Sequence, residues 1–184
     1  MAIVRLATNA DVPEIVRIVR AVYEEYGFTW EEAGYHADLY DVDAHYTGRG
    51  HCFFVAQPGG DPNHNSVAGT AALKLFDAIP GEPGEVTEQH GKRRLCGADS
   101  SLDRLYVEPG ARKHGLGSAL FRIVCKEAQR RGRRMLEIWS DKRFVDAHRL
   151  YQRFGAKSVA ERVLDDPDQS PEWGLLLPLD GLTD

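Results

Sequence analysis

The feature that most constrains the fold is a glycine-rich turn between a predicted strand and a predicted helix. The segment "SSLDRLYV" (residues 100–107) favours a strand, and "EPGARKHGLG" (108–117) is followed at once by an apolar pattern of helical spacing. The first amides of a helix have no acceptor within the helix, and the helix dipole adds partial positive charge there. Glycine lets a ligand approach the backbone closely. The arrangement therefore predicts an anion site, most naturally one for phosphate.

Three kinds of phosphate-binding turn compete for this segment. A P-loop requires G-x-x-x-x-G-K-[ST]; Gly110 and Gly115 have that separation, but Leu116 and Gly117 stand where Lys and Ser/Thr are needed. A dinucleotide fingerprint requires G-x-G-x-x-G, and Leu120 occupies its third glycine position. Each of these two patterns therefore lacks a residue that it requires, and a third pattern remains.

The segment "RKHGLG" (112–117) matches the R/Q-x-x-G-x-G/A signature of the Gcn5-related N-acetyltransferase (GNAT) superfamily. Its flanking strand and helix resemble that superfamily's central strand and acyl-CoA-binding helix. "RFVDAHRLYQRFGA" (143–156) resembles its later helix, and "IVRLATNADVPEIVRIV" (3–19) its first strand and helix. The resemblance implies one α/β GNAT-like acyltransferase domain over residues 1–184, in which a mixed central β-sheet is flanked by helices on both faces.

Acetyl-CoA is the cosubstrate that this resemblance implies. Turn amides would hold its pyrophosphate, and strand backbone groups would pair with its pantetheine arm as an added strand does. Arg112 and Lys113 would add positive charge to the site; the alternative for both is a solvated charge at the surface. His114 is predicted to lie at the surface. The implied cofactor-binding residues are Leu105, Tyr106, Val107, Arg112, Lys113, His114, Gly115, Leu116, Gly117 and Ser118.

Acyl transfer to an amine requires a base for the ammonium proton and an acid for the departing thiolate. Tyr151 stands at the superfamily's tyrosine position, and a phenol with a pKa near 10 keeps its proton at neutral pH. The alternative is a tyrosine packed at the sheet edge. Ser101 occupies the place of a strand glutamate that many relatives use as base, so Asp103 or a water chain are the candidates instead. His148, one turn before Tyr151, is predicted to be a surface or edge histidine.

The implied function is transfer of acetyl from acetyl-CoA to a primary amine of a small molecule or peptide. The alternative is a non-catalytic acyl-CoA-binding, sensor or interaction domain on the same fold, which the missing strand glutamate supports. The acidic and aromatic segment "HADLYDVDAHY" (36–46) suits a cationic amine, or is a solvated helix face. A homodimer is left open, because dimers are common in the superfamily.

Composition excludes other classes. A net charge of −5 argues against a nucleic-acid binder, whose affinity depends on neutralising phosphates. No apolar run approaches the roughly 20 residues of a membrane span, and the first residues lack a signal-peptide pattern. The sequence has 3 cysteines in no metal-binding or disulfide spacing, so we expect no metal and a cytoplasmic protein.

The remaining pattern gives the order of elements. Periodic apolar residues predict a helix over 12–26 that is stopped by Gly27, and a second, more polar helical region over 30–46. Two Pro-Gly steps predict a long loop over 77–97. The strands expected besides 3–8 and 100–107 are 51–57 and 67–76, paired as a hairpin, 134–140, 156–163 and 171–179.

Overall fold

The computed structural model describes residues 2–59 and 66–182, and the chain divides into two units. The first unit consists of Met1–Leu73 and Arg104–Val124, and the second of Lys74–Asp103 and Cys125–Asp184. Each unit is therefore built from two stretches that lie apart in the sequence. The single domain over residues 1–184 stays a prediction.

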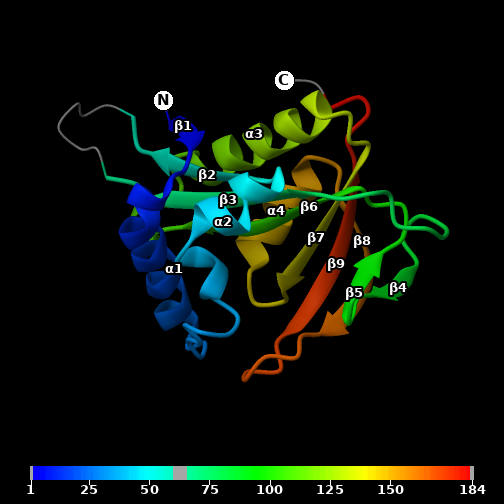
Figure 1. Cartoon of the computed structure of the whole chain (residues 1–184), viewed down its shortest axis with the longest axis horizontal. Helices are drawn as coiled ribbons and strands as arrows, with labels where there is room; N and C mark the ends of the chain where they lie inside the picture. Colours follow the sequence, from blue (N-terminus) through cyan, green and yellow to red (C-terminus); the bar gives the residue numbers. More distant parts are fainter. Residues whose placement is uncertain (1, 60–65, 183–184) are drawn as a thin grey trace. The chain divides into compact units, whose positions relative to one another are not determined.

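The strands form a mixed sheet, which confirms the predicted α/β class. Seven of the strands in the described residues follow the order β1-β2-β3-β6-β7-β9-β8, and β4 and β5 pair separately (Figure 1). β6 runs parallel to β7, whereas β1 with β2, β2 with β3, β7 with β9, and β8 with β9 are antiparallel. The strands are β1 (Ile3–Leu6), β2 (Cys52–Gln57), β3 (Gly69–Leu75), β4 (Val86–Gln89), β5 (Lys92–Leu95), β6 (Ser100–Val107), β7 (Met135–Asp141), β8 (Lys157–Val163) and β9 (Pro171–Pro178).

Helices of two kinds connect these strands. Within residues 2–59 and 66–182, no helix has the length and apolar character needed to cross a membrane. The α-helices are α1 (Val12–Tyr26), α2 (Val42–His45), α3 (Leu116–Arg130) and α4 (Val145–Arg153). The short 3-10 helices are η1 (Asn9–Asp11), η2 (Ala37–Leu39), η3 (Thr47–Arg49) and η4 (Pro109–Ala111).

Local signals set both ends of α1 in the first unit. The Asp11 carboxylate accepts the Thr8 amide at 2.9 Å in a capping box that starts η1, which leads directly into α1, and it pairs with Arg5 at 2.6 Å. Gly27, with φ of 69°, ends the helix in the left-handed conformation that glycine adopts without strain. The helix as predicted is confirmed, and its buried residues are Ile15, Ile18, Val19 and Val22.

The segment after α1 is not the single polar helix predicted over 30–46. Residues 31–40 form turns and the 3-10 helix η2, and α2 is only a short helix. The Asp41 side chain accepts a hydrogen bond from the Ala44 amide at 3.0 Å and so caps α2 as a separate helix. Three of its apolar side chains have no exposed surface and join the core of the unit, namely Leu39, Val42 and Tyr46.

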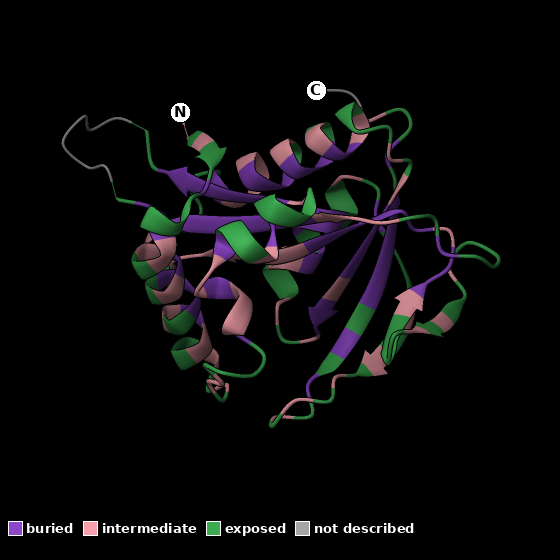
Figure 2. Ribbon diagram, in the orientation of Figure 1, coloured by how far each residue is buried: buried purple, intermediate pink, exposed green. Residues whose placement is uncertain are grey.

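Strand β2 confirms the strand that was predicted from an uninterrupted apolar run over 51–57. All of its residues are buried, as Figure 2 shows for β2 together with most of β3. A strand covered on both faces has no polar alternation, unlike a half-exposed one. The predicted hairpin of β2 and β3 is confirmed by a register that runs from Cys52↔Leu73 to Ala56↔Gly69.

The second unit contains a hairpin where the sequence predicted a loop over 77–97. β4 and β5 pair from Val86↔Leu95 to Gln89↔Lys92. Between them, His90 and Gly91 have φ of 51° and 72°, as the two central residues of a type I′ turn require. The prediction was wrong because both strands are short and charged, and because His-Gly is a weaker turn signal than Asn-Gly. The hairpin lies beside β8, since Arg162 donates to the Arg93 carbonyl at 2.8 Å (Figure 1).

Candidate active site

The glycine-rich turn joins β6 to α3 as the sequence predicted. Lys113 and Gly115 have φ of 66° and 81°, so the backbone twice adopts the left-handed conformation just before the helix. A Cβ at Gly115 would meet nothing within 4 Å, so this face of the turn is open. The helix then starts with the Ala119 amide donating to the Gly115 carbonyl at 2.9 Å.

The turn presents a row of amides that the fold leaves unused. In the part of the chain that the structure describes, the backbone N–H groups of 113–118 donate to no acceptor. They stand at the N-terminal end of α3, where the helix dipole adds partial positive charge. Consecutive amides in such a turn form a concavity that suits an anion. The turn therefore has the electrostatic character of a phosphate site.

Arg112 is held by a partner that the sequence did not indicate. Its guanidinium donates to both carboxylate oxygens of Glu25, at 2.8 Å for the first, and to the Val107 carbonyl at 3.2 Å. Glu25 belongs to α1, so the ion pair ties the turn to that helix. Lys113 and His114 are exposed, as predicted for His114.

β6 is irregular in the middle, which the alternation of its sequence did not show. Arg104 has φ of 55°, a conformation that costs a side-chain-bearing residue roughly 1–3 kcal/mol. Its carbonyl accepts the Thr70 hydroxyl at 2.8 Å from β3. Leu105, Tyr106 and Val107 follow with half-buried side chains. Such a left-handed residue re-aims the strand, as bulges beside functional sites do.

The predicted catalytic residues belong to the second unit, whereas the predicted cofactor-binding residues belong to the first. Ser101 is buried on β6 and registers with Glu137 on β7. Asp103, half-buried, forms an ion pair with Lys74 of β3 at 2.6 Å. A base at Asp103 would therefore act beside a lysine.

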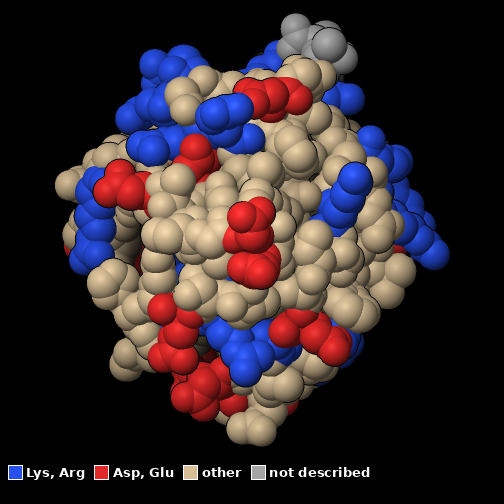
Figure 3. All heavy atoms as spheres, turned by 90° about the vertical axis from the view of Figure 1, so that its right-hand side faces the viewer, with Lys and Arg blue, Asp and Glu red and all other residues tan. Residues whose placement is uncertain are grey.

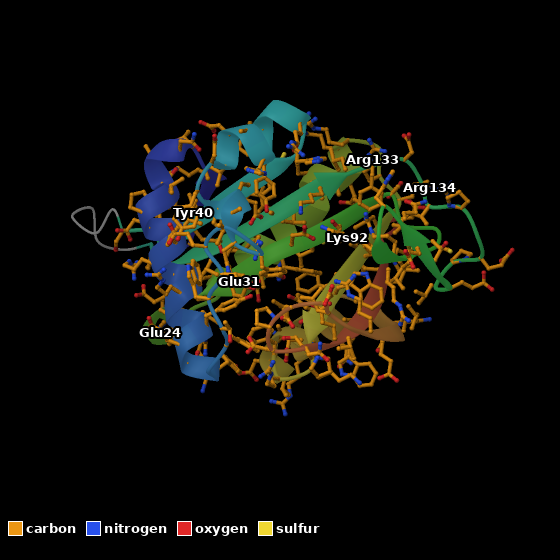
Figure 4. All side chains as sticks on the ribbon, turned by 60° about the horizontal axis from the view of Figure 1, so that its bottom comes forward. Glu24, Glu31, Tyr40, Lys92, Arg133 and Arg134 are labelled. Carbon is orange, nitrogen blue, oxygen red and sulfur yellow. The ribbon has the colours of Figure 1, made fainter. Side chains whose placement is uncertain are left out.

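Glu137 is a buried carboxylate that sequence reasoning missed. Its side chain is 2% exposed, is paired with Arg94 of the β4–β5 hairpin and accepts the Leu95 amide at 2.8 Å. Burial raises the pKa of Glu137, although Arg94 and the Leu95 amide oppose that shift. An acidic residue inside an apolar strand pattern was the only signal in the sequence. Figure 4 labels Lys92, the first residue of β5, the strand that also contains Arg94 and Leu95.

Tyr151 lies on the buried face of α4, where it is 4% exposed. For His148, one turn earlier, a surface or edge position was predicted; it is not at the surface, because it is buried and its Nε2 lies 3.1 Å from the Ser140 hydroxyl. Burial lowers the pKa of His148, and hydrogen bonds to the backbone of Ser140 and Asp141 oppose this. The contact ties α4, and with it Tyr151, to the end of β7.

The cysteines are buried free thiols, namely Cys52, Cys96 and Cys125. Across the described residues, His, Cys, Asp and Glu side chains form no group of three or more that could hold a metal ion.

A family model described as the acetyltransferase (GNAT) family matches residues 16–156. The chain belongs to the GNAT acetyltransferase family. The matched range includes the glycine-rich turn, β6, α3 and α4, which carried the resemblance in the sequence. Comparison with curated proteins gives no match.

Solved structures share the GNAT fold with this chain. A GNAT-family acetyltransferase from Staphylococcus aureus Mu50 is similar with a TM-score of 0.72 and 16% identity, over 98% of this chain and 100% of that one. The protein yncA from Salmonella typhimurium, solved with its cofactor acetyl-CoA, gives 0.65 and 18% over 100% and 96%. The ribosomal-protein-S18-alanine N-acetyltransferase from Escherichia coli gives 0.65 and 18% over 100% of both chains. At these identities, the likeness supports the fold.

Proposed function

We propose that this GNAT protein is an N-acetyltransferase that moves acetyl from acetyl-CoA to a primary amine of a small molecule or peptide. The observation that carries the proposal is the row of unused amides at 113–118, on the residues that match the family signature. The Salmonella protein, which has the same fold, was solved with acetyl-CoA as its cofactor. No nucleic-acid substrate is proposed, since the net charge is −5. The face seen in Figure 3 carries both basic and acidic side chains.

In this proposal the turn binds the pyrophosphate of the coenzyme. The unused amides of 113–118 donate to phosphate oxygens, and Gly115 and Gly117 allow the close approach. The backbone of Leu105, Tyr106 and Val107 pairs with the pantetheine arm. The Arg112 guanidinium adds positive charge when it exchanges the Glu25 carboxylate for a phosphate oxygen.

The residues of the second unit supply the proton transfers in this proposal. The amine attacks the thioester carbonyl and coenzyme A leaves as a thiol. Tyr151 donates the proton to the leaving sulfur, which as general acid contributes roughly 10²–10⁴-fold. Asp103 accepts the ammonium proton directly, or Ser101 and Asp103 orient a water that does so.

The alternative is a non-catalytic acyl-CoA-binding, sensor or interaction domain on the same fold. It is favoured by Ser101, whose hydroxyl is no base at neutral pH, and by the ion pair that holds Asp103 against Lys74. Both functions need the turn to bind the coenzyme, so they differ only in turnover.

Calorimetric titration of acetyl-CoA, with ATP and NAD as controls, tests the binding step. We expect micromolar affinity for acetyl-CoA alone, and its loss in Gly117→Glu, which places a carboxylate among the unused amides. Gly110→Glu is the matched control, because it adds the same charge before the turn, where a Cβ meets nothing within 4 Å. Unchanged affinity in Gly117→Glu contradicts the phosphate site.

Turnover separates the two functions. Release of coenzyme A thiol that depends on an added amine, across a panel of amino acids, polyamines and peptides, supports the enzyme. Tight acetyl-CoA binding with only slow, amine-independent hydrolysis supports the binding domain.

A further inference from the structure

Lys74 is a primary amine that the fold holds against the proposed base. Its Nζ forms an ion pair with Oδ2 of Asp103 at 2.6 Å, and both residues lie in the second unit. Lys74 belongs to β3 and Asp103 to β6, two strands that are neighbours in the sheet. In the proposed reaction, Asp103 accepts a proton from the ammonium of the acceptor. The chain therefore already places an ammonium of its own where the acceptor ammonium has to donate.

The proposed course of the coenzyme along β6 brings its thioester toward this ion pair. The pyrophosphate is bound by the amides of 113–118, and the pantetheine arm pairs with the backbone of 105–107. Because the acetyl group is carried at the end of that arm far from the pyrophosphate, the arm runs along β6 away from the glycine-rich turn. Its thioester end passes Leu105 and reaches the part of the strand that contains Asp103.

Exposure distinguishes Lys74 from most lysines of the chain. Its side chain is 37% exposed, and that of Lys142, which pairs with Glu161, is 32% exposed. The other lysines are exposed, namely Lys92, Lys113, Lys126 and Lys157. A thioester that acetylates lysines without catalysis reacts first with exposed amines, because these are the most accessible. Acetylation of the half-buried Lys74 ahead of them would therefore mark transfer inside the site.

We propose that the chain acetylates its own Lys74 within one molecule, a self-acetylation that rests on the proposed N-acetyltransferase function. The Lys74 ammonium gives one proton to Asp103, and the freed lone pair forms the N–C bond to the thioester carbonyl. The C–S bond breaks, the sulfur takes a proton from Tyr151, and the second proton of the nitrogen replaces it. The products are Nε-acetyllysine, coenzyme A thiol and one proton, which is on Asp103.

Self-acetylation ends the ion pair between Lys74 and Asp103. Acetyl-lysine carries no charge, so it no longer competes for Asp103 with the ammonium of an external acceptor. The reaction stops at one acetyl group per chain at this site, and it leaves Asp103 free to accept protons from external amines. The ion pair that favours a non-catalytic domain is then a property of the unmodified chain.

Mass spectrometry after incubation with acetyl-CoA, in the absence of any added amine, tests the self-acetylation. We expect the intact chain to gain the mass of one acetyl group, and proteolytic mapping to place that group on Lys74. Lys74→Arg should gain none there, whereas Lys142→Arg, the matched control at the other half-buried lysine, should react as the wild type does. An unmodified Lys74, or acetyl groups spread equally over the exposed lysines, overturns the proposal.

Two variants separate catalysed transfer within one chain from other routes. Asp103→Asn should slow the acetylation of Lys74 about 10²-fold or more, because it keeps the size of the side chain and removes the base. An isotope-labelled Gly117→Glu chain, which keeps Lys74 but should not bind the coenzyme, is mixed with unlabelled wild-type protein, and the acetyl group should appear on the unlabelled chain alone. Equal rates in Asp103→Asn and wild type, or equal acetylation of the two mixed chains, overturn the proposal.

The mass of each chain as isolated is measured first, and an acetyl group already on Lys74 in the wild type but absent from Gly117→Glu supports the proposal. Calorimetry of acetyl-CoA and amine-dependent release of coenzyme A thiol report on the proposed function in the same samples. Binding and amine-dependent turnover by a chain whose Lys74 stays unmodified overturn the self-acetylation alone. Absence of acetyl-CoA binding removes the proposed function as well.

Discussion

Gly174 is the position where an added methyl group should reveal how tightly the second unit packs. Gly174 of β9 registers with Trp139 of β7, and a Cβ there would lie 2.7 Å from Cζ3 and 2.8 Å from Cη2 of the indole. Carbon atoms in contact normally stand about 3.5–4.0 Å apart. The ring would have to move, although the Arg162 guanidinium lies over it at 4.2 Å.

The expected cost of Gly174→Ala follows from these contacts. Overpacking costs about 1–3 kcal/mol, and loosening the Arg162 cation–π contact costs roughly 0.5–1 kcal/mol. Replacing glycine by alanine also stabilises the protein by about 0.4–1 kcal/mol, because it lowers the conformational entropy of the unfolded chain. We expect a net loss of about 1–3 kcal/mol, which lowers the melting temperature by roughly 2–12 °C for a chain of this size.

Thermal unfolding followed by circular dichroism measures this effect, and a double-mutant cycle assigns it. In a Trp139→Leu background the same Gly174→Ala change should cost little, because the indole atoms are gone. Gly110→Ala, where a Cβ meets nothing within 4 Å, is the matched control. An equal loss in the wild-type and Trp139→Leu backgrounds would refute the reasoning.

Three further predictions concern the candidate site. Tyr151→Phe should lower kcat about 10²-fold or more with little change in KM for acetyl-CoA, and an unchanged kcat in steady-state assays would remove Tyr151 as the acid. Gly115→Ala should cost about 1–2 kcal/mol by urea unfolding, because its φ of 81° strains a side chain that meets no neighbour, and Gly115→Asn should cost less; equal losses would contradict this. Glu137 has a raised pKa in the folded state, so folding favours its protonated form, and the free energy of unfolding should fall as pH rises from about 4.3 through that pKa. Glu137→Gln should lack this contribution, and identical pH profiles for the two proteins would show that Glu137 does not titrate differently on folding.

Most regular elements could be predicted because their signals are local. The capping box of Thr8 and Asp11, Gly27 after α1 and the apolar run of β2 each act within a few residues. The glycine-rich turn was also predictable, because glycine adopts the left-handed conformation seen at Gly115 without steric cost.

The sequence could not predict features that depend on distant partners. Glu137 is defined by Arg94 and the Leu95 amide, which lie more than 40 positions earlier in the chain. The burial of His148 depends on Ser140, and the position of Arg104 depends on Asp38 and the Tyr35 carbonyl. Spacing within one helix or strand carries no information about such distant pairs. Glu137 and the burial of His148 therefore could not be predicted from spacing.

The interleaving of the two units has a consequence for the nascent chain during synthesis. The first unit needs Arg104–Val124, so β2 emerges with its apolar residues before its own unit can be completed. At roughly 5–20 residues per second, the intervening 74–103 alone delay completion by about 2–6 s. The second unit in turn opens with 74–103 and waits for Cys125–Asp184. We expect folding to be largely post-translational and to depend on protecting β2, and truncation after Leu73 to give an aggregation-prone fragment.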